Sequence, residues 1–159
     1  GKSTLLNLIA GIDKPNLGDI IFNDLILTNL SENERSHFLR NKVGFIYQDY
    51  QLIETKTVYE NIKLGLSFSG YKNNDYDEKI KKIAFDLNIN DLLDKYPYNL
   101  SGGEKQRTAI ARALIKDPKI ILADEPTGAI DSNQSLKIMD ILKDISKDRL
   151  VIIASHDLL

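Results

Sequence analysis

The stretch Leu100-Ser101-Gly102-Gly103-Glu104-Lys105-Gln106-Arg107 is the most informative part of the 159-residue chain. A serine and two glycines come directly before an amphipathic run that continues to Leu114, and this pattern predicts a helix that begins at the serine. The serine hydroxyl, the unobstructed N–H groups of the glycines and the positive end of the helix dipole could together face an anion. The stretch therefore indicates a phosphate-binding turn, and a turn that only caps a helix is the alternative.

The first four residues, Gly1-Lys2-Ser3-Thr4, match the closing half of a phosphate loop. In such a loop, backbone N–H groups at a helix N-terminus bind phosphate, the lysine reaches the β- and γ-phosphates and a hydroxyl binds Mg²⁺. The apolar run that follows predicts a helix that ends at Gly11. Because these residues look like the middle of a motif, we expect the chain to be truncated before Gly1, where the opening glycines, a strand and an adenine-stacking aromatic residue should lie.

Two acids follow a short apolar segment at residues 119–123. A buried parallel strand that ends in Asp124 and Glu125 would place both carboxylates at the carboxyl edge of the sheet, where open α/β sheets bind ligands. Asp124 is predicted to hold Mg²⁺, and Glu125 to orient or deprotonate an attacking water. A helix cap or a solvated turn is the alternative for an Asp-Glu pair in this position.

The order of the segments predicts an α/β fold with a mostly parallel sheet flanked by helices and an inserted α-helical subdomain. The expected strands are residues 18–22, 43–47, 119–123 and 150–155. The expected helices follow Ser3, the capping-box pair Ser31 and Glu34, and Ser101, and a last one carries Ile138 to Ile145. Residues 57–94 also have a helical pattern. We therefore assign 1–48 and 118–159 to an incomplete core, and 49–117 to the helical subdomain; further strands should follow Leu159.

Composition excludes several classes of protein. The 21 basic and 23 acidic residues are scattered along the chain, so no basic face for nucleic acid is expected. Cysteine is absent, which excludes disulfides and thiolate metal sites. The apolar runs, such as residues 150–154, are far shorter than the roughly 20 residues that a membrane-spanning helix requires. The chain is expected to cross no bilayer by itself.

With these motifs in this order, the chain resembles the ATPases of the ATP-binding cassette (ABC) family, and the eight residues from Leu100 match a common form of the family's signature motif. The resemblance implies a P-loop NTPase that binds ATP and Mg²⁺ and hydrolyses the nucleotide. It also implies a second ATP-binding subunit, in a homodimer, because the family's signature closes over the γ-phosphate held by the other subunit. The residues at 101–103 would act on the partner's nucleotide, whereas Lys2, Ser3, Thr4, Asp124 and Glu125 would act on the chain's own.

Three more positions match the family. Gln48, at the end of its strand, would touch Mg²⁺ or water, so that Ser3, Gln48 and Asp124 are the expected metal ligands. His156 matches a histidine that hydrogen-bonds the γ-phosphate, and its imidazole can donate from either ring nitrogen. Asp131 matches an aspartate that contacts the opposite subunit, with Ile130 where leucine is commoner. Glu125, His156 and Gln48 are the expected catalytic residues.

The segments at 45–53 and 122–128 resemble the branch of the family that serves lipoprotein release, macrolide export and antimicrobial-peptide transport. The implied partner is a transmembrane permease with a large extracytoplasmic domain, which would hold the chain at the cytoplasmic face of the cell membrane. Residues 49–57 would lie beside the groove that receives a coupling helix of the permease. Substitutions at Tyr50 and Leu52 are therefore expected to weaken complex formation or permease-stimulated ATP hydrolysis.

Cassette ATPases outside transport are the alternatives. An ATPase of DNA repair would place a long coiled coil between Gln48 and Ser101, but only 52 residues intervene and they lack sustained heptads. A cassette that acts on ribosomes, or a non-catalytic module of division or sensing, stays open. The presence of Glu125 and His156 favours turnover. Because half of the phosphate loop is absent, we expect the 159 residues alone to bind ATP weakly.

Overall fold

A three-stranded parallel sheet forms the centre of the computed structural model, which describes residues 1–67 and 76–156. The strands lie in the order β3 (Val43–Ile46), β4 (Ile120–Asp124) and β5 (Leu150–Ala154). In the register, Ile46 lies opposite Ala123, and Asp124 lies opposite Ala154. The three strands therefore end together at one edge, and the predicted parallel sheet is confirmed.

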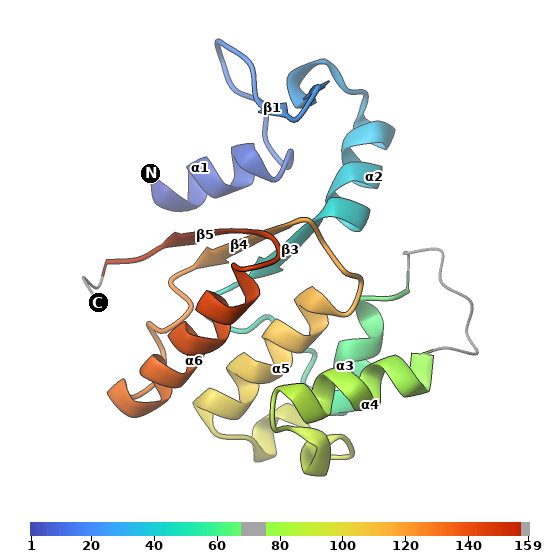
Figure 1. Ribbon diagram of the computed structural model, residues 1–159, viewed down its shortest axis with the longest axis vertical. Helices are drawn as coiled ribbons and strands as arrows, with labels where there is room; N and C mark the ends of the chain where they lie inside the picture. Colours follow the sequence, from blue (N-terminus) through green and yellow to red (C-terminus); the bar gives the residue numbers. More distant parts are fainter. Residues whose placement is uncertain (68–75, 157–159) are drawn as a thin grey trace.

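Helices cover both faces of the sheet (Figure 1). On one side lie α1 (Lys2–Ile9) and α2 (Glu32–Lys42). On the other side lie α3 (Val58–Leu64), α4 (Tyr76–Asp86), α5 (Gly102–Leu114) and α6 (Ser132–Ile145). The central strand β4 shows the consequence, because Ile120 and Leu122 belong to the core on the α1 side, whereas Ile121 and Ala123 belong to the core on the α5 side. A strand buried on both faces has to be apolar throughout, which is the pattern that the sequence shows.

Capping boxes begin three of these helices. In each, a serine or threonine side chain accepts the N–H of the glutamate three residues later, and that glutamate accepts the N–H of the cap. The pairs are Ser31 with Glu34, Thr57 with Glu60, and Ser101 with Glu104. The first pair was predicted, and the helix that follows it ends at Lys42. Single 3₁₀ turns lie at Leu27–Asn29, Asn90–Leu92 and Pro97–Asn99.

The expected strand at 18–22 is much shorter than predicted. Only β1 (Ile21–Phe22) is extended, and it pairs antiparallel with β2 (Leu25–Ile26). Asn23, between the two strands, has a φ of 52°, the left-handed conformation that asparagine tolerates in a two-residue hairpin turn. This turn was not recognised in the sequence. The expected helical stretch at 57–94 contains α3, α4 and a 3₁₀ turn, and its residues 68–75 lie outside the described part of the chain.

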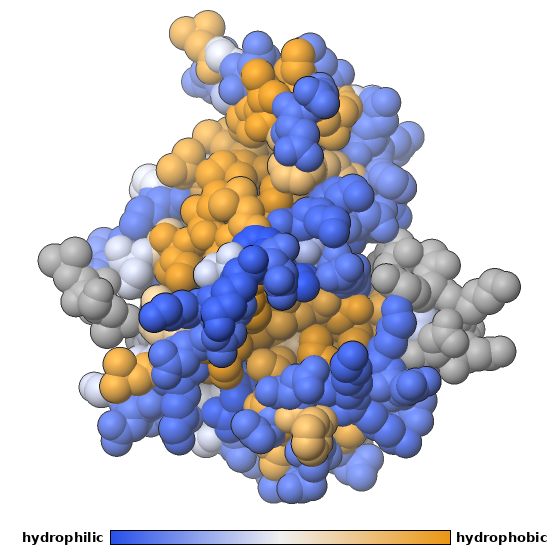
Figure 2. All heavy atoms as spheres, in the orientation of Figure 1, coloured by the Kyte–Doolittle hydropathy of each residue, from blue (hydrophilic) through white to orange (hydrophobic). Residues whose placement is uncertain are grey.

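Apolar side chains are exposed on the side of the hairpin and α1 (Figure 2). The most exposed are Leu17, Ile21 and Leu5, at 93%, 62% and 57%. None of the described helices is long and apolar enough to cross a membrane. No described element covers the apolar patch beside the hairpin and α1.

Candidate functional site at the carboxyl edge of the sheet

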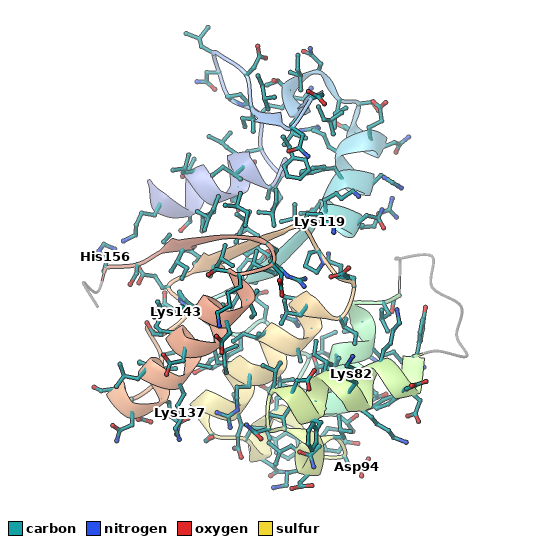
Figure 3. The ribbon with its side chains drawn as sticks, in the orientation of Figure 1. Lys82, Asp94, Lys119, Lys137, Lys143 and His156 are labelled. Atoms are coloured by element: carbon teal, nitrogen blue, oxygen red, sulfur yellow. The ribbon has the colours of Figure 1, made fainter. Side chains whose placement is uncertain are left out.

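The predicted site residues lie at or just after the carboxyl ends of the three parallel strands. Gln48 follows β3, Asp124 ends β4, Glu125 comes next, and His156 follows β5. Figure 3 shows His156 at the free end of β5, on the side where α1 starts. Nζ of Lys2, the first residue of α1, lies 3.0 Å from Oε1 of Glu125. The structure thus brings Lys2 together with Glu125 and His156. These two residues are 123 or more positions from Lys2 in the sequence.

Glu125 is the centre of this cluster. Its Oε2 accepts a hydrogen bond of 3.0 Å from the backbone N–H of His156, whose Nε2 lies 3.7 Å from the other carboxylate oxygen. The side chain of Glu125 is only 14% exposed. Its φ of 47° is unusual for a residue with a Cβ, and its own N–H donates to the carbonyl of Ala154 at 2.8 Å. The hydrogen bonds with Ala154 and His156 therefore hold Glu125 in a backbone conformation that is otherwise unfavourable.

The charge of Glu125 follows from these contacts. Burial acts to raise the pKa of its carboxyl, but the hydrogen bond from His156 and the ammonium of Lys2 outweigh burial, so the pKa lies below its ordinary value. At neutral pH the group is ionised. It can accept a proton or a hydrogen bond from water once Lys2 moves away.

The first turn of α1 is open to an anion. Gly1 is its N-cap and makes no side-chain cap, the turn contains no acid, and Ser3 and Thr4 are exposed. A Cβ added at Gly1 would meet nothing within 4 Å. The unpaired N–H groups of a helix N-terminus attract negative charge, and here Lys2 in the first turn pairs with the carboxylate of Glu125. A phosphate would find free N–H groups, two hydroxyls and one ammonium.

The predicted Mg²⁺ ligands fit a site in which phosphate oxygens of the nucleotide would complete the coordination of the metal. Within residues 1–67 and 76–156, no group of three or more His, Asp or Glu side chains could hold a metal by itself. Mg²⁺ commonly takes one or two carboxylates together with phosphate oxygens and water, so a set with one carboxylate, that of Asp124, suits it. Gln48 lies against Gly128, where an added Cβ would come within 3.0 Å of its Nε2. The roles of Ser3, Gln48 and Asp124 stay predictions.

The turn at Ser101 lies away from this cluster. Figure 1 shows that the start of α5 and the start of α1 are well separated, on opposite sides of the sheet. The Oγ of Ser101 donates to Oε2 of Glu104 at 2.8 Å, and the serine is exposed. The structure therefore does not bring Ser101, Gly102 or Gly103 to Lys2 and Glu125 of the same chain.

The two glycines of this turn are packed against the segment before α6 and the first turn of that helix. A Cβ at Gly102 would come within 2.9 Å of Cγ2 of Ile130, and one at Gly103 within 2.7 Å of Oε1 of Gln134. Asp131 caps α6, because its carboxylate accepts the N–H of Gln134 at 3.0 Å. The signature turn and the Asp131 segment thus form one block on the surface.

Two polar residues that were not predicted from the sequence, one buried and one partly buried, hold the segment after Gln48. Asn61 is fully buried, and its amide bonds to the backbone of Ile53, Lys56 and Thr57. Arg112 donates to the carbonyls of Tyr50 and Gln51. The signal that could have revealed them is a polar side chain inside an otherwise apolar helical pattern, which needs a partner when it is buried.

Comparison with known proteins gives a consistent result. A family model described as "ABC transporter" matches residues 1–128. The bacitracin export ATP-binding protein BceA of Halalkalibacterium halodurans is 42% identical over 159 residues, which are 99% of this chain and 63% of that protein. The lipoprotein-releasing system ATP-binding protein LolD of Buchnera aphidicola subsp. Acyrthosiphon pisum is 39% identical, over 99% of this chain and 70% of that protein. The chain thus spans about two thirds of the length of these relatives.

The fold has equally clear matches among solved structures. The ATP-binding cassette MJ0796, solved as a dimer in a post-hydrolysis state bound to ADP and Pi, superposes with a TM-score of 0.87 at 35% identity. The superposition covers 99% of this chain and 71% of that one. The similarity therefore includes both the carboxyl edge of the sheet and the helices around α5.

Proposed function

Because the chain belongs to the ABC transporter family, we propose that it is the nucleotide-binding part of a subunit that hydrolyses MgATP and powers a separate permease. The observation that carries the proposal is the cluster of Lys2, Glu125 and His156 beside the open N-terminus of α1. It combines an anion site with an ionised carboxylate at the carboxyl edge of a parallel sheet. Phosphoryl transfer to water needs these two features, because positioning and charge neutralisation account for most of its catalysis.

In the proposed reaction, the phosphates of ATP bind the N–H groups at the start of α1, and Lys2 leaves Glu125 to reach them. The freed carboxylate orients the attacking water and accepts its proton. His156, held beside Glu125 by its own N–H, donates from its imidazole to the γ-phosphate. Mg²⁺, held by Ser3, Gln48 and Asp124, would neutralise charge on the phosphate oxygens.

The separation of the Ser101 turn from Lys2 supports a site shared between two subunits. The turn is exposed on the far side of the sheet from α1, so its serine and glycines would serve a nucleotide on another chain (Figure 1). Asp131, beside the same turn, would contact that chain as well. The dimer reported for MJ0796 with ADP and Pi is consistent with this arrangement.

The transport role rests on the relatives. BceA exports bacitracin and LolD releases lipoproteins by their names, and both resemble this chain at about 40% identity. The proposed process is the export or extraction of a peptide, macrolide or lipoprotein by a permease that anchors this subunit at the cytoplasmic face of the membrane. In this proposal the helical subdomain, residues 49–117, is the part that meets the permease.

The test uses the complete subunit, with its full phosphate loop. Phosphate release is measured for the wild type, for Glu125→Gln and for Lys2→Ala, with Asp144→Asn as a control that changes the net charge by the same amount at an exposed carboxylate. Glu125→Gln should lower kcat at least about 100-fold while the protein still dimerises with ATP, because removal of a catalytic base typically costs that much. Lys2→Ala should lose ATP binding. Normal hydrolysis by Glu125→Gln would refute the assigned role of the carboxylate.

A further inference from the structure

One arginine holds the loop after Gln48 from a helix that lies more than 60 residues away in the sequence. Arg112, in the last turn of α5, donates from Nη2 to the carbonyl of Tyr50 at 2.8 Å and from Nη1 to the carbonyl of Gln51. Its neighbours Ala111 and Ala113 are buried in the core. Because a guanidinium presents its donors in a rigid fork, it fixes the direction of two consecutive carbonyls, which an ammonium does less well.

The loop conformation depends on such an anchor. Tyr50 and Gln51 have φ values of 63° and 51°, so two successive residues with a Cβ adopt the left-handed conformation. That conformation is unfavourable for them, and it persists only where the surroundings impose it. The other local contacts, from Gln51 to the carbonyl and side chain of Asp49, lie within the loop itself. The contact with Arg112 therefore ties the strained backbone of Tyr50 and Gln51 to α5.

The side chain of Tyr50 contacts the segment before α6, not Arg112. Its Oη donates to the carbonyl of Ala129 at 3.2 Å, in the segment that leads to Asp131. The same oxygen lies 3.0 Å from the position that a Cβ on Gly102 would take. Tyr50 thus contacts both members of the block formed by the signature turn and the Asp131 segment, while its carbonyl is held by Arg112 near the opposite end of α5.

We propose that Arg112 and Tyr50 form a positioning link that keeps Gln48, the signature turn and the segment before Asp131 in register for ATP hydrolysis. The inference rests on the proposed function, since these three elements matter together only if the chain hydrolyses ATP between two subunits. Neither residue touches the α1 end of the site in the described structure, so both act through others. Without the guanidinium, the loop relaxes to negative φ and Tyr50 leaves Ala129.

If this link exists, its loss should affect ATP affinity and the rate of hydrolysis differently. Affinity of the single subunit for ATP depends on Lys2 and its neighbours and should not change. The rate of the chemical step depends on how the shared surface is placed, and should fall. A residue that only stabilised the fold would lower the unfolding temperature without separating kcat from KM in this way.

The experiment compares Arg112→Lys, Tyr50→Phe and the double variant in the complete subunit. Arg149→Lys is the matched control, because Arg149 also donates to a distant carbonyl, that of Pro118 at 3.1 Å, and lies outside the site. Hydrogen exchange is followed at residues 49–53 and 127–131 without nucleotide. Arg112→Lys should speed exchange about fivefold or more in both segments, and Tyr50→Phe only in the second, since each loses roughly one hydrogen bond.

Steady-state hydrolysis is then measured for the same proteins. Each single variant should lower kcat about fivefold with KM for ATP changed less than about twofold, and the double variant should be no slower than Arg112→Lys, because both changes break one link. Unchanged exchange at 127–131 in Arg112→Lys, or multiplicative losses in the double variant, would overturn the inference. If the wild type does not hydrolyse ATP, the proposed function fails, and the exchange data still decide whether the link exists.

Discussion

Replacing Glu125 by glutamine should tighten nucleotide binding while it slows turnover strongly. In the structure without nucleotide, the ammonium of Lys2 is engaged with the carboxylate of Glu125 at 3.0 Å. The same ammonium is needed for the phosphates. ATP must therefore break this ion pair before it gains the lysine, and part of its binding free energy is spent on that exchange.

The size of the effect follows from the surroundings of the pair. The side chains of Lys2 and Glu125 are 36% and 14% exposed, so water partly screens the interaction. Ion pairs of this kind contribute about 1 kcal/mol, the upper end of the range for exposed pairs. That energy corresponds to about a fivefold decrease in Kd. The difference should shrink as ionic strength rises, because salt screens the pair.

The assay is calorimetric titration of the complete subunit with a non-hydrolysable ATP analogue, at protein concentrations at which it stays monomeric. Asp144→Asn serves again as the control, because it removes one negative charge at an exposed site in the last turn of α6. Any general attraction of the anionic ligand to a less acidic protein would appear in both variants. An unchanged or larger Kd in Glu125→Gln, with the control unchanged, would refute the competition between Glu125 and the phosphates.

Three further changes test the packing and the charges. Asn61→Ala removes four hydrogen bonds of a fully buried amide and should lower the free energy of unfolding by about 3 kcal/mol, measured by urea denaturation; a loss below about 1 kcal/mol would contradict the anchoring role. Gly44→Ala should cost about 2 kcal/mol, because its Cβ would come within 2.9 Å of the carbonyl oxygen of Ala113, and a neutral result would mean that β3 and α5 separate easily. Burial lowers the pKa of Lys116 to about 8, so its charge destabilises the fold below that pH, and stability should rise as pH increases from 8 towards the unfolded-chain value near 10.4. Lys116→Met should therefore be more stable than the wild type at pH 7 by about 1 kcal/mol, less than the full pKa shift implies because the bond to the carbonyl of Leu39 is lost, and the gain should disappear near pH 10.

The parts of the fold that the sequence predicted are those in which the local pattern and the tertiary environment agree. Residues 120–123 are apolar without alternation because helices cover both faces of β4, and the capping box at Ser31 is read directly from residue types. The hairpin at Asn23 was missed because its strands have only two residues each, too few to show a period. Its turn is visible only in the left-handed conformation of the asparagine.

The site was predictable to the extent that strand ends meet at one edge. Asp124 ends β4, and Glu125 and His156 come just after β4 and the neighbouring β5, so their approach is expected in a parallel sheet. The ion pair between Lys2 and Glu125 and the positive φ of Glu125 could not be read from the sequence, because they depend on how α1 and β5 are placed. The same holds for Arg112, whose partners are carbonyl groups and therefore leave no trace in the residue types of the loop.

Gly102 and Gly103 also have a packing role that could not be predicted from the sequence. Their missing side chains were expected to expose N–H groups to an anion, yet the space beside them is filled by Ile130, Gln134 and the hydroxyl of Tyr50. The absence of a Cβ at Gly102 therefore lets Ile130 pack closely against the signature turn. In the proposed two-subunit arrangement, the turn completes one nucleotide site and Asp131 contacts the subunit that holds it. Because the two are packed together in one chain, we expect a shift of either on nucleotide binding to move the other.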